Sequence, residues 1–180
     1  MKELSLHILD IVQNSIAANG KNIFLTVVED VEADELKITV SDDGKGMSSE
    51  MIKAVENPFV TGRTTRKVGL GIPLLKNAAE NTGGGISISS ELGRGTEISA
   101  TFGYSSIDRQ PLGNMAETML GLITSYEDIN FVYLHKVNGK EFSFSTGEMK
   151  EILGGISFKE PEIVLWLSDY LKENEADLYV

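Results

Sequence analysis

The stretch "HILDIVQNS", residues 7–15, combines the apolar periodicity of an amphipathic helix with a polar stripe along one side. On an α-helix, positions three and four apart lie on the same side, so His7, Asp10 and Asn14 point roughly the same way. Taken alone, this stripe is equally consistent with the solvated edge of a surface helix. The helical pattern extends over residues 3–18, where "ANG" provides a stop signal.

The composition is that of a folded globular protein, with 41% hydrophobic and 24% charged residues among 180. Much of the net charge of −11 comes from residues 103–180, which hold 13 acidic and 6 basic side chains. An acidic surface repels phosphodiester backbones and anionic lipids, so we expect no nucleic-acid partner and no membrane partner.

The chain has no cysteine, which excludes disulfides, thiol catalysis and cysteine-ligated metals. Its amino terminus has acids and amides within the apolar run and lacks a small-residue cleavage site, unlike a secretory signal. No run approaches the roughly 20 apolar residues that span a bilayer. We therefore expect a cytoplasmic location.

Periodicity in the first 102 residues predicts helices and at least four strands in a mixed order. This order favours an α+β fold, a two-layer α/β sandwich, over a doubly wound parallel sheet. The β-rich runs 22–30 and 35–42 are expected to form an antiparallel pair. The other elements predicted in this part are helices at 48–55 and from 70 onward, and strands at 86–91 and 96–102.

Beyond residue 104 the pattern changes, and we divide the chain into a domain at 1–104 and a small α/β extension at 105–180. "SSIDRQPLGN" (105–114) is predicted to be a linker, because a proline and a glycine punctuate it. Asn138-Gly139 between alternating apolar runs is a strong hairpin signal. The helices predicted in the extension cover 114–126, the residues after a Thr146 cap, and 160–178.

The motif "SDDGKGM" (41–47) places carboxylates beside two glycines at the end of a predicted strand. Gly44 and Gly46 let the chain turn tightly and let a flat ligand approach the backbone without meeting a Cβ. The carboxylate of Asp42 can accept a hydrogen bond from an exocyclic amine such as that of adenine. The motif alone is also compatible with a plain loop, whereas an EF-hand is excluded because Lys53 stands where its bidentate glutamate is required.

The stretch "TGRTTRKVGLGIPLLK" (61–76) places Arg63, Arg66 and Lys67 shortly before a predicted helix. The N–H groups and positive dipole end of a helix start suit a phosphate chain. A basic surface loop would have the same composition. A P-loop is excluded, because no G-x-x-x-x-G-K-[ST] occurs in the sequence.

Taken in order, the motifs resemble the GHKL superfamily of ATP-binding domains, which includes gyrase, heat-shock chaperone, histidine-kinase and MutL ATPases. The ordered set covers residues 3–102 and consists of D-x-x-x-N-S on a helix, D-x-G-x-G, P-F, T-T-R, G-L-G, and the G-x-G-T of "LGRGTE" (92–97). The resemblance implies a Bergerat fold, an α/β sandwich whose lid closes over ATP and Mg²⁺.

Residue by residue, the resemblance implies that Asn14 holds Mg²⁺ through its amide oxygen and that Asp42 accepts the adenine amine. Gly44 and Gly46 would open the pocket for the base, and Thr96 would support the adenine end. The remaining residues of the implied nucleotide-binding set, in the lid and at the helix that follows it, are Thr65, Arg66, Gly69, Leu70 and Gly71.

Asp10 stands where similar proteins carry the glutamate that activates the attacking water or hydroxyl, so it is the predicted general base. Because its side chain is one methylene shorter, it could instead act through a water or hold the Mg²⁺ shell. His7 lacks the surroundings of a phosphoacceptor histidine and is expected to be packed or at a polar edge. His135 is interpreted as a plain strand residue, and Trp166 as a core or interface anchor.

The resemblance predicts an ATP- and Mg²⁺-binding protein kinase or phosphotransfer-type regulator that acts on a partner protein. Two alternatives are a slow ATPase that works as a conformational switch and a non-catalytic ATP-sensing module. The lid and the "GRGT" turn look most like those of histidine kinases and anti-sigma serine kinases, whereas "DIVQNS" looks closer to MutL. Since the chain begins at the ATP-binding helix, we expect a stand-alone member. Its oligomeric state stays open.

Overall fold

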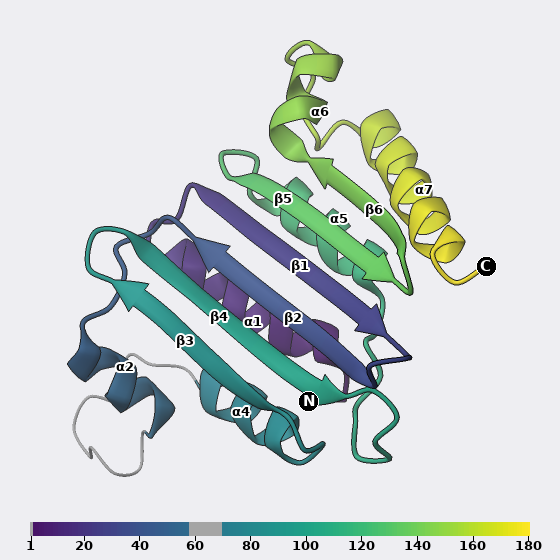
Figure 1. Ribbon diagram of the computed structural model, residues 1–180. Coiled ribbons are helices and arrows are strands. Elements are labelled where there is room, and N and C mark those ends of the chain that lie inside the picture. Colours follow the sequence, from purple (N-terminus) through teal and green to yellow (C-terminus); the bar gives the residue numbers. More distant parts are fainter. Residues whose placement is uncertain (1, 58–69) are drawn as a thin grey trace.

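The computed structural model describes residues 2–57 and 70–180, and its elements form two layers (Figure 1). Within these two ranges, six strands form one sheet, and helices cover one of its faces, which confirms the predicted two-layer α/β sandwich. In chain order the elements are α1 (Leu4–Ala17), β1 (Asn22–Asp30), β2 (Glu35–Asp42), α2 (Ser49–Glu56), α4 (Gly71–Glu80), β3 (Gly85–Glu91), β4 (Gly95–Gly103), α5 (Met115–Ser125), β5 (Asn130–Val137), β6 (Lys140–Ser145), α6 (Thr146–Leu153) and α7 (Pro161–Asp177).

The strand order in the sheet is β3-β4-β2-β1-β5-β6. The predicted antiparallel pair β1–β2 is confirmed, and β1 also pairs in parallel with β5, so strands of the extension continue the sheet of the first domain. Ile23, Leu25 and Val27 alternate along β1 toward the helices and are almost fully buried, whereas Phe24 between them is exposed on the opposite face. This period of two fixes which face each strand buries.

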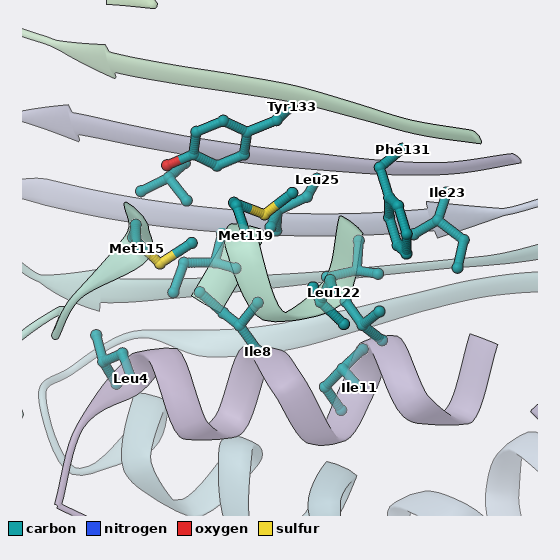
Figure 2. Packing of buried hydrophobic residues seen from close by; sticks show 14 of the residues in the cluster. Leu4, Ile8, Ile11, Ile23, Leu25, Met115, Met119, Leu122, Phe131 and Tyr133 are labelled. Carbon is teal, nitrogen blue, oxygen red and sulfur yellow. The ribbon is translucent and has the colours of Figure 1, made fainter. Parts of the chain in front are cut away.

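The hydrophobic core is shared between the two parts of the chain (Figure 2). Ile8 and Ile11 of α1 lie beside Met119 and Leu122 of α5, beneath the parallel pair β1 and β5. The division near residue 104 therefore stays a prediction about function, since sheet and core continue across it.

The predicted linker at 105–114 is packed against the start of α1. Helix α1 has no side-chain cap, and the N–H groups of Leu4 and Ser5 donate instead to the carbonyls of Pro111 and Leu112, at 2.9 and 2.8 Å. The segment thus supplies acceptors that the first turn of a helix needs. It joins the extension to α1 directly.

The hairpin of the extension turns at Asn138 and Gly139, whose φ angles of 49° and 90° are those of a two-residue turn that favours this pair.

The predicted Thr146 cap is wrong by one residue. Ser145 is the N-cap of α6, and the Thr146 hydroxyl instead accepts from the N–H of Phe131 at 2.9 Å. No helix in the described ranges is both long enough and apolar enough to cross a bilayer.

The last helix, α7, packs through Leu167 and Leu171, which are fully buried, and Tyr170 contacts Phe142 of β6 edge to face at 5.6 Å. The expected anchor Trp166 is 47% exposed and stacks on Tyr170, so it is not a core residue. The final helix therefore packs on the rest of the extension.

A buried charged cluster joins α7 to the sheet. His135, which is fully buried, lies 2.7 Å through Nε2 from Glu29 and 2.7 Å through Nδ1 from Glu175. Tyr133 donates to Glu175 at 2.7 Å, and Tyr179 donates to Glu29 at 2.5 Å. Burial alone would lower the pKa of His135, but the two carboxylates overcome burial and raise the pKa to about 9. His135 is therefore a protonated imidazolium at neutral pH that attaches α7 to the sheet through Glu175, rather than a plain strand residue.

Candidate functional site

A pocket of about 190 Å³ lies between α1, α2, the start of α4 and the sheet. Its lining includes four residues of the predicted site, namely Asn14, Asp42, Gly46 and Thr96. The walls are mostly apolar. The other lining residues are Ile11, Ser15, Ala17, Ala18, Lys45, Met47, Met51, Val55, Ile72 and Ile98.

The carboxylate of Asp42 is held from two sides. Oδ2 accepts from the hydroxyl of Ser15 at 2.6 Å, and Oδ1 accepts from the N–H of Gly44 at 2.8 Å. Each carboxylate oxygen has a second lone pair, so both can still accept from a ligand. Ser15 is 4% exposed and was not foreseen as a site residue. Its place next to Asn14 in the helical motif was the available signal.

The glycines of "DDGKG" allow the loop to approach its neighbours closely. A Cβ on Gly46, where φ is +70°, would lie 2.0 Å from the carbonyl oxygen of Glu91, and a Cβ on Gly44 would lie 2.6 Å from that of Ala18. Between them, the N–H of Lys45 donates to the Ala18 carbonyl at 2.9 Å. Of the two glycines, only Gly46 lines the pocket. Close backbone contact is thus a physical reason for glycine at both positions.

Thr96 is tied to the same loop through Ser90, a second residue that the sequence did not reveal. The Ser90 hydroxyl accepts from the N–H of Met47 at 2.7 Å, and it lies 2.7 Å from the Thr96 hydroxyl. It also donates to the carbonyl of Gly95 at 2.9 Å. One half-buried hydroxyl therefore joins the loop, β3 and β4 beside Thr96.

Asp10 lies one helical turn before Asn14, outside the pocket lining. Asn14 is exposed, while Asp10 is half-buried beside the start of α4. A Cβ on Gly71 would lie 3.3 Å from the Cβ of Asp10, so glycine permits this approach. Leu70 precedes the helix and is 57% exposed. The structure thus brings the Asp10 carboxylate to the positive end of a helix.

Several predicted site residues lie outside the described ranges. These are the nucleotide-binding candidates Thr65, Arg66 and Gly69, and the weaker candidates Arg63 and Lys67.

His7 faces the segment 105–114 rather than the pocket. Its Nε2 lies 3.1 Å from the side-chain oxygen of Gln110, and the ring is 3% exposed. Burial lowers the pKa of His7, which favours the neutral ring. This agrees with the packed interpretation of His7 and not with a phosphoacceptor.

Residues 2–105, more than half of the chain, match the model of a family described as histidine kinase-, DNA gyrase B- and HSP90-like ATPases. The chain belongs to this family, which is the GHKL group that the motifs resemble.

The relatives include sensor histidine kinases. An uncharacterized sensor-like histidine kinase of Rhizobium meliloti (strain 1021) is 35% identical over 52% of this chain and 19% of its own length. Sensor histidine kinase ZraS of Escherichia coli (strain K12) is 27% identical over 59% of this chain and 23% of its own length. Sporulation kinase D of Bacillus subtilis (strain 168) is 33% identical over 55% of this chain and 19% of its own length. The matched region spans about a fifth of these relatives.

Solved structures show the same fold. The Aquifex aeolicus MutL ATPase domain complexed with ADP has a TM-score of 0.50 at 13% identity, covering 86% of this chain and 70% of that one. The N-terminal domain of a DNA repair protein has a TM-score of 0.52 at 15% identity, covering 79% and 52%. The predicted GHKL sandwich is confirmed.

Proposed function

We propose that this chain binds ATP and Mg²⁺ and transfers the γ-phosphoryl group to a partner protein. The observation that carries the proposal is the Asp42 carboxylate, which Ser15 and Gly44 hold in place in a mostly apolar pocket. An apolar slot with one fixed acceptor suits a flat base that carries an exocyclic amine. The kinase names of the relatives support phosphoryl transfer.

The size of the pocket supports a site for the base rather than for a whole nucleotide. Its volume of about 190 Å³ is below the ~300 Å³ at which sites for drug-sized ligands begin. Asn14 is both exposed and part of the lining, so its amide is available to a group that extends from the pocket toward solvent.

The residues near Asn14 suit phosphate chemistry. Mg²⁺ bound to the Asn14 amide oxygen, to phosphates and to waters would offset the phosphate charge. Asp10, one turn away, would accept the proton of the attacking hydroxyl. The N–H groups at the start of α4, beside Asp10, would stabilise negative charge on the transferred group.

The role of Asn14 is tested by nucleotide titration with and without Mg²⁺. Wild type should bind ATP more tightly with Mg²⁺, and Asn14→Ala should lose about 10- to 100-fold in that Mg²⁺-dependent affinity, as expected for one bond to a charged group. Gln13→Ala is the matched control, because this neighbouring amide accepts from Tyr126 instead. An Asn14→Ala protein with the full Mg²⁺ dependence would remove the metal assignment.

A second candidate is a slow ATPase whose output is conformational, favoured by the sheet and core that continue from the pocket into the extension. Incubation with γ-labelled ATP and candidate partners separates the two. Label on a protein supports the kinase, label only as free phosphate supports the switch, and intact ATP supports a sensing module.

Asp10→Ala should slow consumption of γ-labelled ATP by about 100-fold or more, the usual contribution of a general base, with ATP affinity kept within about twofold. Single-turnover rates and a binding titration measure the two effects. Unchanged turnover in this variant would exclude Asp10 as the base.

A further inference from the structure

A row of hydrogen-bonded side chains runs along one end of the strands, from the pocket loop to the first turn of α6. It begins at Asp43, which follows Asp42 in the loop. Asp43 Oδ1 accepts from the N–H groups of Lys21 and Asn22 at 2.7 and 3.0 Å. Its Oδ2 accepts from the side-chain amide of Asn22 at 2.8 Å. The loop is thereby attached to the start of β1.

The row continues across the parallel pair of strands. The side-chain oxygen of Asn22 accepts from the side-chain amide of Asn130, its register partner at the start of β5, at 3.1 Å. The side-chain oxygen of Asn130 accepts from the N–H of Gly147 at 2.9 Å. Since α6 begins at Thr146, the row ends on the free N–H groups of that helix.

The row has a fixed direction. An ionised carboxylate only accepts, so Asp43 requires the NH₂ side of Asn22, which turns the Asn22 oxygen toward Asn130. Asn130 must then give its NH₂ to Asn22 and its oxygen to α6. Neither amide can flip alone without losing bonds on both sides. The pKa of the Asp43 carboxyl is held below its usual range, chiefly by the Asn22 side chain and backbone N–H, so the anchor stays charged.

The two ends of the row lie at the pocket and at α6. At the pocket end, a ligand amine would bond to Asp42, which precedes Asp43 in the chain and also accepts from the N–H of Gly44. At the far end, α6 has eight residues, and the N–H of Glu148 donates to the hydroxyl of the cap residue Ser145 over a long distance of 3.5 Å. Of the two side-chain acceptors that serve N–H groups of this first turn, Asn130 is the closer, at 2.9 Å from the nitrogen of Gly147.

We propose that nucleotide occupancy of the pocket regulates the order of α6 through the hydrogen-bonded row Asp43–Asn22–Asn130, so that the extension reports the nucleotide state. This inference rests on the proposed function, because it needs a nucleotide at Asp42.

Amide hydrogen exchange of the whole chain tests it, with a non-hydrolysable ATP analogue and Mg²⁺ at saturation and without them. Amides of the pocket loop 42–47 report binding, and amides of α6 report transmission. In wild type, exchange in α6 should slow by about fivefold on binding, the low end of usual coupling between sites.

We define the protection ratio as the exchange rate of α6 without nucleotide divided by its exchange rate at saturating nucleotide. Asn22→Ala and Asn130→Ala should each bring this ratio close to one. By reciprocity, nucleotide should bind about fivefold more tightly to protein whose α6 is ordered than to protein whose α6 is disordered. If the two asparagines only stabilised α6, exchange would be faster in both states and the ratio would stay fivefold. That result would overturn the inference.

Asn174→Ala is the matched control. Its amide lies in α7 of the same extension and donates to the carbonyl of Tyr170, outside the row, so the ratio should be kept. A protected pocket loop with unchanged α6 in wild type would overturn the inference and leave the proposed function intact. No protection of either region, with no binding by titration, would overturn both.

Discussion

Asp42→Asn is expected to weaken ATP binding by about 100-fold, the value of a hydrogen bond to a charged group together with the mismatch that the amide creates. The two oxygens of Asp42 face one donor each, Ser15 and the N–H of Gly44. The hydroxyl of Ser15 can also accept, so the NH₂ group of the substituted side chain faces Ser15. The remaining amide oxygen is uncharged and accepts more weakly from a ligand amine. Calorimetric titration measures the loss.

The same variant should narrow the preference for ATP over GTP, because an amide can donate to the oxygen that guanine carries where adenine has its amine. Asp30→Asn is the matched control, since this carboxylate accepts from Ala33 in the turn after β1. Normal ATP affinity in Asp42→Asn would refute the placement of the base.

His135→Ala is expected to lower the free energy of unfolding by about 3–5 kcal/mol, since it removes the shared partner of two carboxylates, one of them buried. Urea unfolding at pH 6 measures the loss. Lys136→Ala is the control from the neighbouring residue, whose pair with Glu141 is exposed at 3.8 Å and should contribute less than about 1 kcal/mol.

The difference in stability between wild type and His135→Ala should depend on pH. The folded-state pKa of His135 is raised from 6.5 to about 9, so its contribution is complete below 6.5 and is lost as pH rises through about 9. Burial alone would raise the pKa of Glu29, but hydrogen bonds from His135 and Tyr179 hold it below 4.5, so its contribution is lost only under more acidic conditions. A difference that stays constant from pH 6 to pH 10 would show that folding does not shift the pKa of His135.

Local patterns predicted the elements well, because helix and strand periods depend on neighbours in sequence. The runs 22–30 and 35–42 became β1 and β2 with the same bounds, and the turn at Asn138 and Gly139 formed as expected. The predicted N-cap of α6 was wrong by one residue, because Ser145 and Thr146 both carry hydroxyl groups that can cap a helix. Only the hydrogen bond between Thr146 and Phe131 in the folded protein distinguishes them.

Sequence motifs predicted some residues of the candidate site, whereas others are recognised only from their contacts in the folded protein. Asn14, Asp42 and Thr96 came from ordered motifs and line one pocket, and their roles toward nucleotide stay predictions for the titrations above. Ser15 and Ser90 were missed, since a serine becomes a support for Asp42 or Thr96 only through the side chain that it meets.

Periodicity and ordered motifs are local properties, so the elements, the sandwich class and the GHKL family were predictable from the amino-acid sequence. Three arrangements were recognisable only in the folded protein: strand β5 extends the sheet beside β1, His135 pairs with Glu29 and Glu175, and Asn22 bonds to Asn130. Sequence separation explains this difference. These partners lie 40 residues or more apart, and one hydrogen bond between such residues leaves no period or spacing in the chain.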